Sequence, residues 1–182
     1  MTPTLDADVL IIGVGPAGSV AACLLRRLGH RVTMLEREQF PRFSIGESLL
    51  PQCMAFLEQA GLLDCVAQEG FQHKNGAAFS HAGKLTEFDF TQKFSAGWGA
   101  TYQVPRARFD HVLADGAARS GAAIHYRQRI SAVDFSRVDR AAITGIDEHG
   151  AERIWHTHFV LDASGFVGES PSIPSIMKFG TG

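Results

Sequence analysis

The stretch DADVLIIGVGPAGSVAACLLRRLGHRVTMLERE, residues 6–38, contains the pattern that decides the fold. Val9 to Ile12 form a continuous apolar run, which predicts a parallel strand buried on both faces. Apolar residues then recur at helical spacing up to Gly29, where the helix is expected to end. A second run, Arg31 to Leu35, predicts another strand that leads to Glu36. The order strand, helix, strand predicts a βαβ unit.

Three glycines occupy the turn between the first strand and the helix, Gly13, Gly15 and Gly18, in the spacing G-x-G-x-x-G. Gly13 permits a tight turn, Gly15 lets a pyrophosphate approach the backbone, and Gly18 lets helix and strand pack closely. The start of the helix offers unpaired N–H groups and the positive end of a dipole. Glu36 lies 18 residues beyond Gly18, near the spacing of roughly 20 expected of the acid that binds a ribose hydroxyl.

This pattern predicts a dinucleotide site, with a structural glycine turn in an unrelated βα unit as the alternative. An acid at Glu36 disfavours a 2′-phosphate, so NADP is not expected, and FAD or NAD remains. The residues alone do not choose between these two.

The composition is that of an ordinary globular protein. Its 182 residues suit one medium domain, or one domain with a small lobe. Hydrophobic residues make up 45% and the formal net charge is −2, so neither a nucleic-acid nor a membrane role is indicated. Cys23, Cys53 and Cys65 follow no metal or redox spacing. With no signal-peptide pattern at the start, we expect a cytoplasmic protein without a metal site.

Three further motifs resemble those of one flavoprotein group. They are PRFSIGESLLP (residues 41–51), YQVPRARFDHVL (102–113) and VLDASG (160–165). In this order they resemble the FAD-dependent monooxygenases of the hydroxybenzoate-hydroxylase fold. Within that superfamily they are most similar to the branch that holds flavin-dependent halogenases and geranylgeranyl-reductase-like oxidoreductases. The resemblance covers nearly the whole chain and implies that the dinucleotide is FAD.

The resemblance also implies which residues bind FAD. Arg106 begins a predicted helix and could reach the phosphates or ribityl hydroxyls of FAD, with pairing to Asp110 as the alternative. Ser48 lies in a loop near the flavin, or it caps a helix predicted over residues 49–60. The candidate cofactor-binding residues are Gly13, Gly15, Pro16, Ala17, Gly18, Glu36, Arg37, Arg42, Ser48, Arg106, Asp162 and Gly165.

Lys74 lies in the stretch GFQHKNGAAF, residues 70–79, where a strand is predicted to begin. In flavin-dependent halogenases a lysine at the matching place faces a tunnel from the flavin and handles hypohalous acid. The resemblance therefore makes Lys74 the candidate catalytic residue, because an ammonium group can hydrogen-bond the oxidant or carry the halogen as a haloamine. A non-catalytic lysine at a strand start is the alternative, since sister oxidoreductases share this context without halogenating.

The expected fold class is α/β: a Rossmann-like FAD-binding domain with a parallel sheet, a β-meander crossover and a partial antiparallel substrate-side lobe. Residues 1–72 and 106–166 are assigned to the FAD-binding domain, and residues 73–105 to the partial substrate-side β lobe. Residues 167–182 are expected to form an irregular tail, interpreted as a truncation or a frameshifted end.

Two local patterns predict antiparallel structure. The stretch AAFSHAGKLTEFDF, residues 77–90, predicts a hairpin with Ala82 and Gly83 at its turn. Apolar segments on either side of DEHG, residues 147–150, predict a meander that leads into the strand ending at Asp162.

These expectations combine into an FAD-binding oxidoreductase, the N-terminal part of a flavin-dependent monooxygenase or halogenase. The resemblance implies an aromatic or carrier-bound aromatic substrate, a flavin C4a-hydroperoxide, and a flavin reductase or NAD(P)H as electron source. We expect the 182 residues alone to be inactive and to self-associate through exposed apolar surface. The alternatives are a non-catalytic FAD- or ADP-binding fragment and an FAD-dependent geranylgeranyl-reductase-like oxidoreductase.

Overall fold

The computed structural model describes residues 5–165, which fall into two compact units. Unit 1 contains the described chain up to residue 40 and from residue 114 onward, and unit 2 contains residues 41–113. These borders differ from the domain borders predicted from the sequence. The predicted borders concern where a substrate-side lobe begins, and they remain a proposal. The predicted tail lies outside the described residues. Within residues 5–165, no helix combines the length and apolar character needed to cross a membrane.

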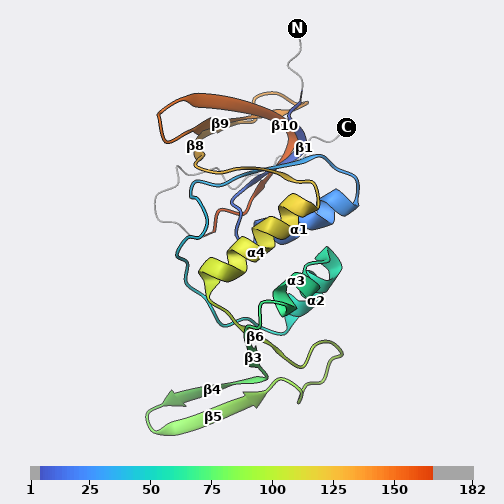
Figure 1. Cartoon of the computed structure of the whole chain (residues 1–182), viewed down its shortest axis with the longest axis vertical. Helices are drawn as coiled ribbons and strands as arrows, with labels where there is room; N and C mark the ends of the chain where they lie inside the picture. The colour runs from blue at the N-terminus through green and yellow to red at the C-terminus, as the bar shows by residue number, and fades with distance from the viewer. Residues whose placement is uncertain (1–4, 166–182) are drawn as a thin grey trace. The chain divides into compact units, whose positions relative to one another are not determined.

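Unit 1 is built on a six-stranded mixed sheet of order β7-β2-β1-β10-β9-β8. Its elements are β1 (Ala7–Ile12), α1 (Pro16–Arg27), β2 (Val32–Leu35), β7 (Ala123–His125), β8 (Arg129–Asp134), β9 (Ala141–Ile146) and β10 (Glu152–Asp162). Strands β7, β2, β1 and β10 run parallel, whereas β9 pairs antiparallel with both β10 and β8. This sheet confirms the predicted α/β class and the meander that enters a parallel strand, and Figure 1 labels its strands β1, β8, β9 and β10.

The βαβ unit forms as the sequence pattern predicts. Strand β1 is buried along nearly its whole length because it is a central strand, with Val9 opposite Val32 on one side and Phe159 on the other. Helix α1 begins at Pro16, where the missing N–H needs no helical partner and the fixed φ already suits a helix. It ends just before Gly29, whose φ of +88° lies in the left-handed region.

The core of unit 1 joins the parallel strands to the meander. Its buried apolar side chains come from β1, β2, β9 and β10: Leu10, Ile12, Leu35, Ala141, Ile143 and Trp155. Burying one large aliphatic side chain stabilises a fold by about 1.5–3 kcal/mol. Gly145 makes room for the largest of them, since an added Cβ there would lie 2.7 Å from Cζ3 of Trp155.

Unit 2 contains short helices and two small antiparallel sheets. Its elements are α2 (Gln52–Ala60), α3 (Leu63–Ala67), β3 (Gln72–Lys74), β4 (Gly76–His81), β5 (Lys84–Asp89), β6 (Thr101–Gln103) and the first part of α4 (Arg106–Arg119), which continues into unit 1. Strand β3 pairs with β6, and β4 with β5, as Figure 1 shows. The β4–β5 hairpin turns at Ala82 and Gly83, both with positive φ, which confirms the predicted hairpin.

Two predictions of local structure were wrong. Helix α2 begins at Gln52 with Pro51 as its N-cap, rather than at residue 49, so Ser48 does not cap it. The physical reason is that the residue before a proline is driven out of the helical region, which stops the helix from extending back. Lys74 is the last residue of β3 and not the first residue of a strand.

Candidate functional site

The glycine turn after β1 is packed too closely for side chains at Gly13 and Gly18. Gly13 has a φ of +98°, and an added Cβ would lie 2.5 Å from the carbonyl oxygen of Ala163, just after β10. An added Cβ on Gly18 would overlap the carbonyl oxygen of Gly13, so α1 packs directly onto the turn. Gly15 is the N-cap of α1, and it makes no side-chain capping bond. Such a helix start is suited to hold phosphate.

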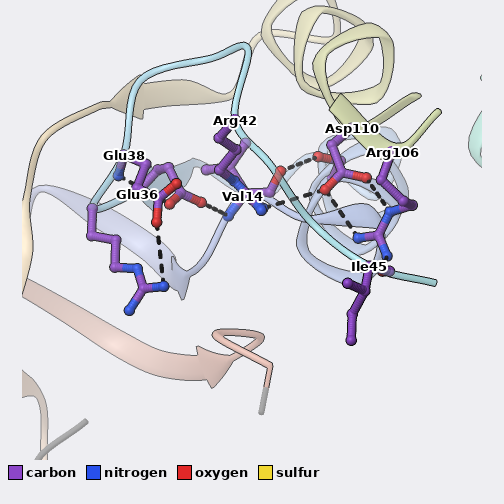
Figure 2. Close-up of polar contacts among 9 residues, drawn as sticks. Val14, Glu36, Glu38, Arg42, Ile45, Arg106 and Asp110 are labelled. Carbon is purple, nitrogen blue, oxygen red and sulfur yellow. Dashed lines mark hydrogen bonds and ion pairs between the residues drawn. The ribbon is translucent and has the colours of Figure 1, made fainter. Parts of the chain in front are cut away.

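Glu36 follows β2 directly, and its carboxylate lies against this turn (Figure 2). Its side chain is buried, with Oε2 accepting a hydrogen bond from the backbone N of Val14 at 2.9 Å and Oε1 one from the backbone N of Glu38 at 3.1 Å. The acid predicted from the spacing is therefore placed beside the turn.

The charge of Glu36 also acts on a neighbouring tyrosine. Burial raises the pKa of Tyr126 above its usual value, and the negative charges of Asp115 and Glu36 raise it further.

The end of β10 lies beside the end of β1. The backbone N of Ala163 donates to the carbonyl oxygen of Ile12 at 2.8 Å, and the backbone N of Ser164 donates to Oδ1 of Asp162 at 3.0 Å. Asp162 is exposed, and Gly165 has a φ of +77°. These residues lie at the carboxyl edge of the parallel strands, where open α/β sheets bind ligands.

In unit 2, two arginines meet at one buried carboxylate (Figure 2). Asp110 is fully buried and accepts hydrogen bonds from Nε and Nη2 of Arg106 at 2.7 and 3.0 Å. Nη2 of Arg42 lies 3.4 Å from Oδ2 of the same carboxylate. Nη1 of Arg106 donates to the carbonyl oxygen of Ile45 at 2.6 Å. The structure thus contains the pairing of Arg106 with Asp110 that the sequence suggested, and it adds Arg42.

Lys74 and Ser48 are also in direct contact in unit 2. Ser48 forms an isolated bridge with Gln103 of β6, and β3, which carries Lys74, pairs with β6 as well. Nζ of Lys74 donates to Oγ of Ser48 at 2.6 Å and to the carbonyl oxygen of Leu49 at 3.0 Å. It also lies 5.1 Å from the ring centroid of Phe90, a cation–π contact. The ammonium group is therefore held at a defined place.

The predicted site residues fall into two groups. Unit 1 holds Gly13, Gly15, Pro16, Ala17, Gly18, Glu36, Arg37, Asp162 and Gly165, and unit 2 holds Arg42, Ser48, Lys74 and Arg106. Within unit 1, Arg37 is exposed and its Nη2 lies 3.3 Å from Oε1 of Glu38. Sequence reasoning missed the bond between Lys74 and Ser48 and the contact of Arg42 with Asp110. Neither pair is close in the chain, so no local spacing could have indicated them.

Comparison with known proteins identifies the family to which this chain belongs. A family model described as an FAD binding domain matches residues 6–173. The tryptophan 2-halogenase of Chondromyces crocatus is 35% identical over 164 residues, which cover 90% of this chain and 31% of that protein.

Solved structures agree in fold. A flavoprotein/dehydrogenase from Cytophaga hutchinsonii is 46% identical, with a TM-score of 0.84 over 87% of this chain and 39% of that one. The myxobacterial chondrochloren halogenase CndH, described as a variant of FAD-dependent halogenases, is 37% identical, with a TM-score of 0.80 over 90% of this chain and 38% of that one.

The chain spans about a third of the length of the curated halogenase named above, 31% of it. Its own geometry fits FAD: Gly13 and Gly18 leave no room for side chains, the start of α1 carries no side-chain cap, and Glu36 bonds to the turn at Val14. The family model matches nearly the whole sequence, and this protein therefore belongs to the FAD binding domain family.

Proposed function

We propose that this chain is the FAD-binding N-terminal part of a flavin-dependent halogenase or monooxygenase that acts on an aromatic or carrier-bound aromatic substrate. The observation that carries the proposal is the setting of Lys74, whose ammonium group is held by Ser48 and by the carbonyl of Leu49 beside the ring of Phe90. Similarity to halogenases over most of the chain supports it.

Residues of the βαβ unit would hold part of FAD. In unit 1 the backbone at Gly15, Pro16, Ala17 and Gly18 would hold the diphosphate, because the start of α1 presents N–H groups and the positive end of its dipole. Glu36 would accept a hydrogen bond from a ribose hydroxyl. When bound and reduced, FAD supplies the activation of dioxygen. A flavin reductase that delivers reduced flavin is part of this proposal.

Lys74 would act on the oxidant rather than on FAD. Its N–H group would donate a hydrogen bond to the oxygen of hypohalous acid, which polarises the oxygen–halogen bond. The aromatic ring then attacks the halogen as that bond breaks, the oxygen takes up a proton and leaves as water, and the ring loses the proton from the same carbon. Ser48 and Leu49 would keep the ammonium in place through this exchange.

The test compares Lys74→Ala with Lys84→Ala, an exposed lysine of the β4–β5 hairpin, in the polypeptide that carries this chain. FAD, a flavin reductase, NADH, oxygen, bromide or chloride, and phenol and pyrrole substrates are supplied, and product masses are measured. We expect Lys74→Ala to abolish halogenated product while flavin reoxidation continues, and Lys84→Ala to retain it. Unchanged halogenation in Lys74→Ala would remove this lysine from the mechanism, and wild-type protein without halide-dependent product would exclude the halogenase.

A reductase is the second candidate, favoured by one observation. The flavoprotein/dehydrogenase from Cytophaga hutchinsonii is 46% identical to this chain, whereas the chondrochloren halogenase is 37% identical. A geranylgeranyl-reductase-like enzyme would reduce isoprenoid double bonds without oxygen. Anaerobic turnover of such a substrate, with no product from the aerobic halide assay, would select it. Flavin binding without either activity would leave a binding module.

A further inference from the structure

Asp110 is a buried carboxylate with more than one cationic partner. It lies on α4, its side chain is fully buried, and Arg106 reaches it with two N–H groups from one turn away in the same helix. Arg42 reaches it from the loop that precedes α2. The side chains of Arg42 and Arg106 are 16% and 15% exposed, so all three charged groups lie largely out of water.

Two guanidinium groups share the carboxylate of Asp110. A buried carboxylate is stable only when it is paired and hydrogen-bonded, and two guanidinium groups over-satisfy it. Without the carboxylate, Arg42 and Arg106 would repel each other and lose the acceptor that fixes their planes. Asp110 therefore converts two long, flexible cations into one fixed pair.

The same cluster sets the path of the loop that follows Arg42. The bond from Nη1 of Arg106 to the carbonyl oxygen of Ile45 ties the loop to α4. Gly46, with a φ of +90°, lies against this guanidinium, and an added Cβ there would be 3.3 Å from Nη1 of Arg106. The backbone at residues 45–46 is thus shaped around a side chain that Asp110 holds.

We propose that Asp110 is a positioning residue that holds Arg42 and Arg106 as a preformed cationic pair for an oxygen-rich part of FAD. This inference rests on the proposed function and on the prediction from the sequence that Arg42 and Arg106 bind FAD. Asp110 itself touches no cofactor atom in this scheme. Its effect is exerted through the guanidinium groups and through the loop that Arg106 ties down.

The experiment uses Asp110→Asn in the 182-residue chain, with Glu69→Gln as the matched control. Glu69 accepts two hydrogen bonds from Arg108 on the same helix, at 2.6 and 2.7 Å, and neither residue contacts the loop after Arg42 through a bond described above. Both substitutions replace a carboxylate that holds an arginine by an uncharged amide. Asp110→Asn releases Arg42 and Arg106, whereas Glu69→Gln releases Arg108.

Two quantities are measured. The first is the rate of trypsin cleavage between Arg42 and Phe43 without FAD, followed by mass spectrometry, because trypsin can use Arg42 only when its guanidinium leaves Asp110. The second is the dissociation constant for FAD, from quenching of flavin fluorescence. We expect Asp110→Asn to raise the cleavage rate and the dissociation constant by about tenfold each, because a hydrogen-bonded charge pair is lost. Glu69→Gln is expected to change each by less than about twofold.

A second variant covers the case in which Asp110→Asn does not fold. Arg42→Lys keeps the positive charge but removes the planar fork, and it leaves the Arg106–Asp110 pair intact. We expect faster cleavage at position 42 and weaker FAD binding at an unchanged melting temperature. If wild-type protein binds FAD and neither variant changes cleavage or affinity, the Asp110 inference is overturned. If cleavage rises as expected but wild-type protein binds no FAD, the cofactor role and the proposed function fail together.

Discussion

A single buried carboxylate closes the glycine turn of unit 1. Each oxygen of Glu36 accepts a backbone N–H, one from Val14 and one from Glu38. A carboxylate offers about four lone-pair sites, so one side chain can accept from both backbone groups at once. The same side chain thus stabilises the turn and would make the proposed ribose contact.

Replacing Glu36 by Gln is expected to weaken both the fold and FAD binding. The amide has one oxygen and one donor nitrogen, so one of the two backbone N–H groups loses its acceptor inside the protein. Leaving a buried donor unsatisfied costs about 1–3 kcal/mol. Urea denaturation measures this loss of stability. Glu38→Gln is the control, because among the ion pairs described above its exposed carboxylate pairs only with the exposed Arg37. This control should change the free energy of unfolding by less than about 0.5 kcal/mol. Equal effects from the two variants would contradict the role given to Glu36.

At the residue scale, the sequence predicts what depends on a short pattern. The tight turn at Gly13, the close packing at Gly18 and the position of Glu36 beside the turn follow from a short pattern with a fixed spacing, and their part in binding FAD stays a prediction. The meeting of Arg42 with Asp110 could not be predicted, because it depends on how a loop returns to α4. Side chains that contact across a long stretch of chain leave no periodic signal.

At the scale of elements, the end of β7 places a histidine against the buried tryptophan of β10. The ring centroids of His125 and Trp155 are 5.8 Å apart, and the guanidinium carbon of Arg153 lies 4.8 Å from the Trp155 ring. Burial lowers the pKa of His125 below its ordinary value of 6.5, the positive charge of Arg153 lowers it further, and Asp6 opposes the shift. The folded protein therefore favours the neutral imidazole.

This shift predicts how stability depends on pH. In the unfolded chain His125 takes up a proton near pH 6.5, its ordinary pKa, whereas in the folded chain it takes up the proton only at a lower pH. The free energy of unfolding should therefore fall as the pH is lowered through about 6.5, and level off below the folded pKa. The difference between wild-type protein and His125→Gln, from urea denaturation at each pH, isolates this contribution. Parallel curves for the two proteins would refute it.

Elements with a clear period were predicted, and short or interrupted ones were not. The βαβ unit and the β4–β5 hairpin follow from hydrophobic spacing and turn residues. Strand β6 has only three residues, too few to show alternation, and it exists because β3 and the bridge at Ser48 pair with it. The start of α2 was misplaced because the effect of Pro51 on its predecessor outweighs the helical pattern.

At the scale of the whole molecule, unit 2 exposes a large amount of apolar surface. Phe79 and Phe88 lie on one face of the β4–β5 hairpin with their ring centroids 5.8 Å apart, and they are 60% and 56% exposed. Leu85 lies on the opposite face and is also exposed. A two-stranded hairpin is marginally stable alone in water, and exposed aromatic pairs of this kind favour association.

We therefore expect the 182-residue chain to self-associate at high concentration, through the face that carries Phe79 and Phe88. The double substitution Phe79→Thr and Phe88→Thr should shift the sedimentation coefficient toward that of a monomer, because it removes the apolar pair and keeps β propensity. Leu85→Thr on the other face serves as the control. An unchanged sedimentation profile in the double variant would refute this assignment of the face.

The class of the fold was predictable from the sequence, but the division into units was not. The alternation of strand and helix at the start and the meander near the end define an α/β sheet with a β-rich insertion. The borders of the units lie at residues 40/41 and 113/114, the second of them inside α4. A continuous helix carries no signal for such a border, since its hydrophobic pattern does not change there.

The neighbour of β1 in the sheet has a consequence for how the protein is made. Ala7 pairs with Thr157, so one side of the first strand stays open until the ribosome has released almost the whole described chain. A loop of this length closes slowly, because contacts distant in sequence form late. During synthesis the unpaired edge of β1 is a template for strands of other chains, so the nascent chain is exposed to edge-to-edge aggregation until β10 arrives.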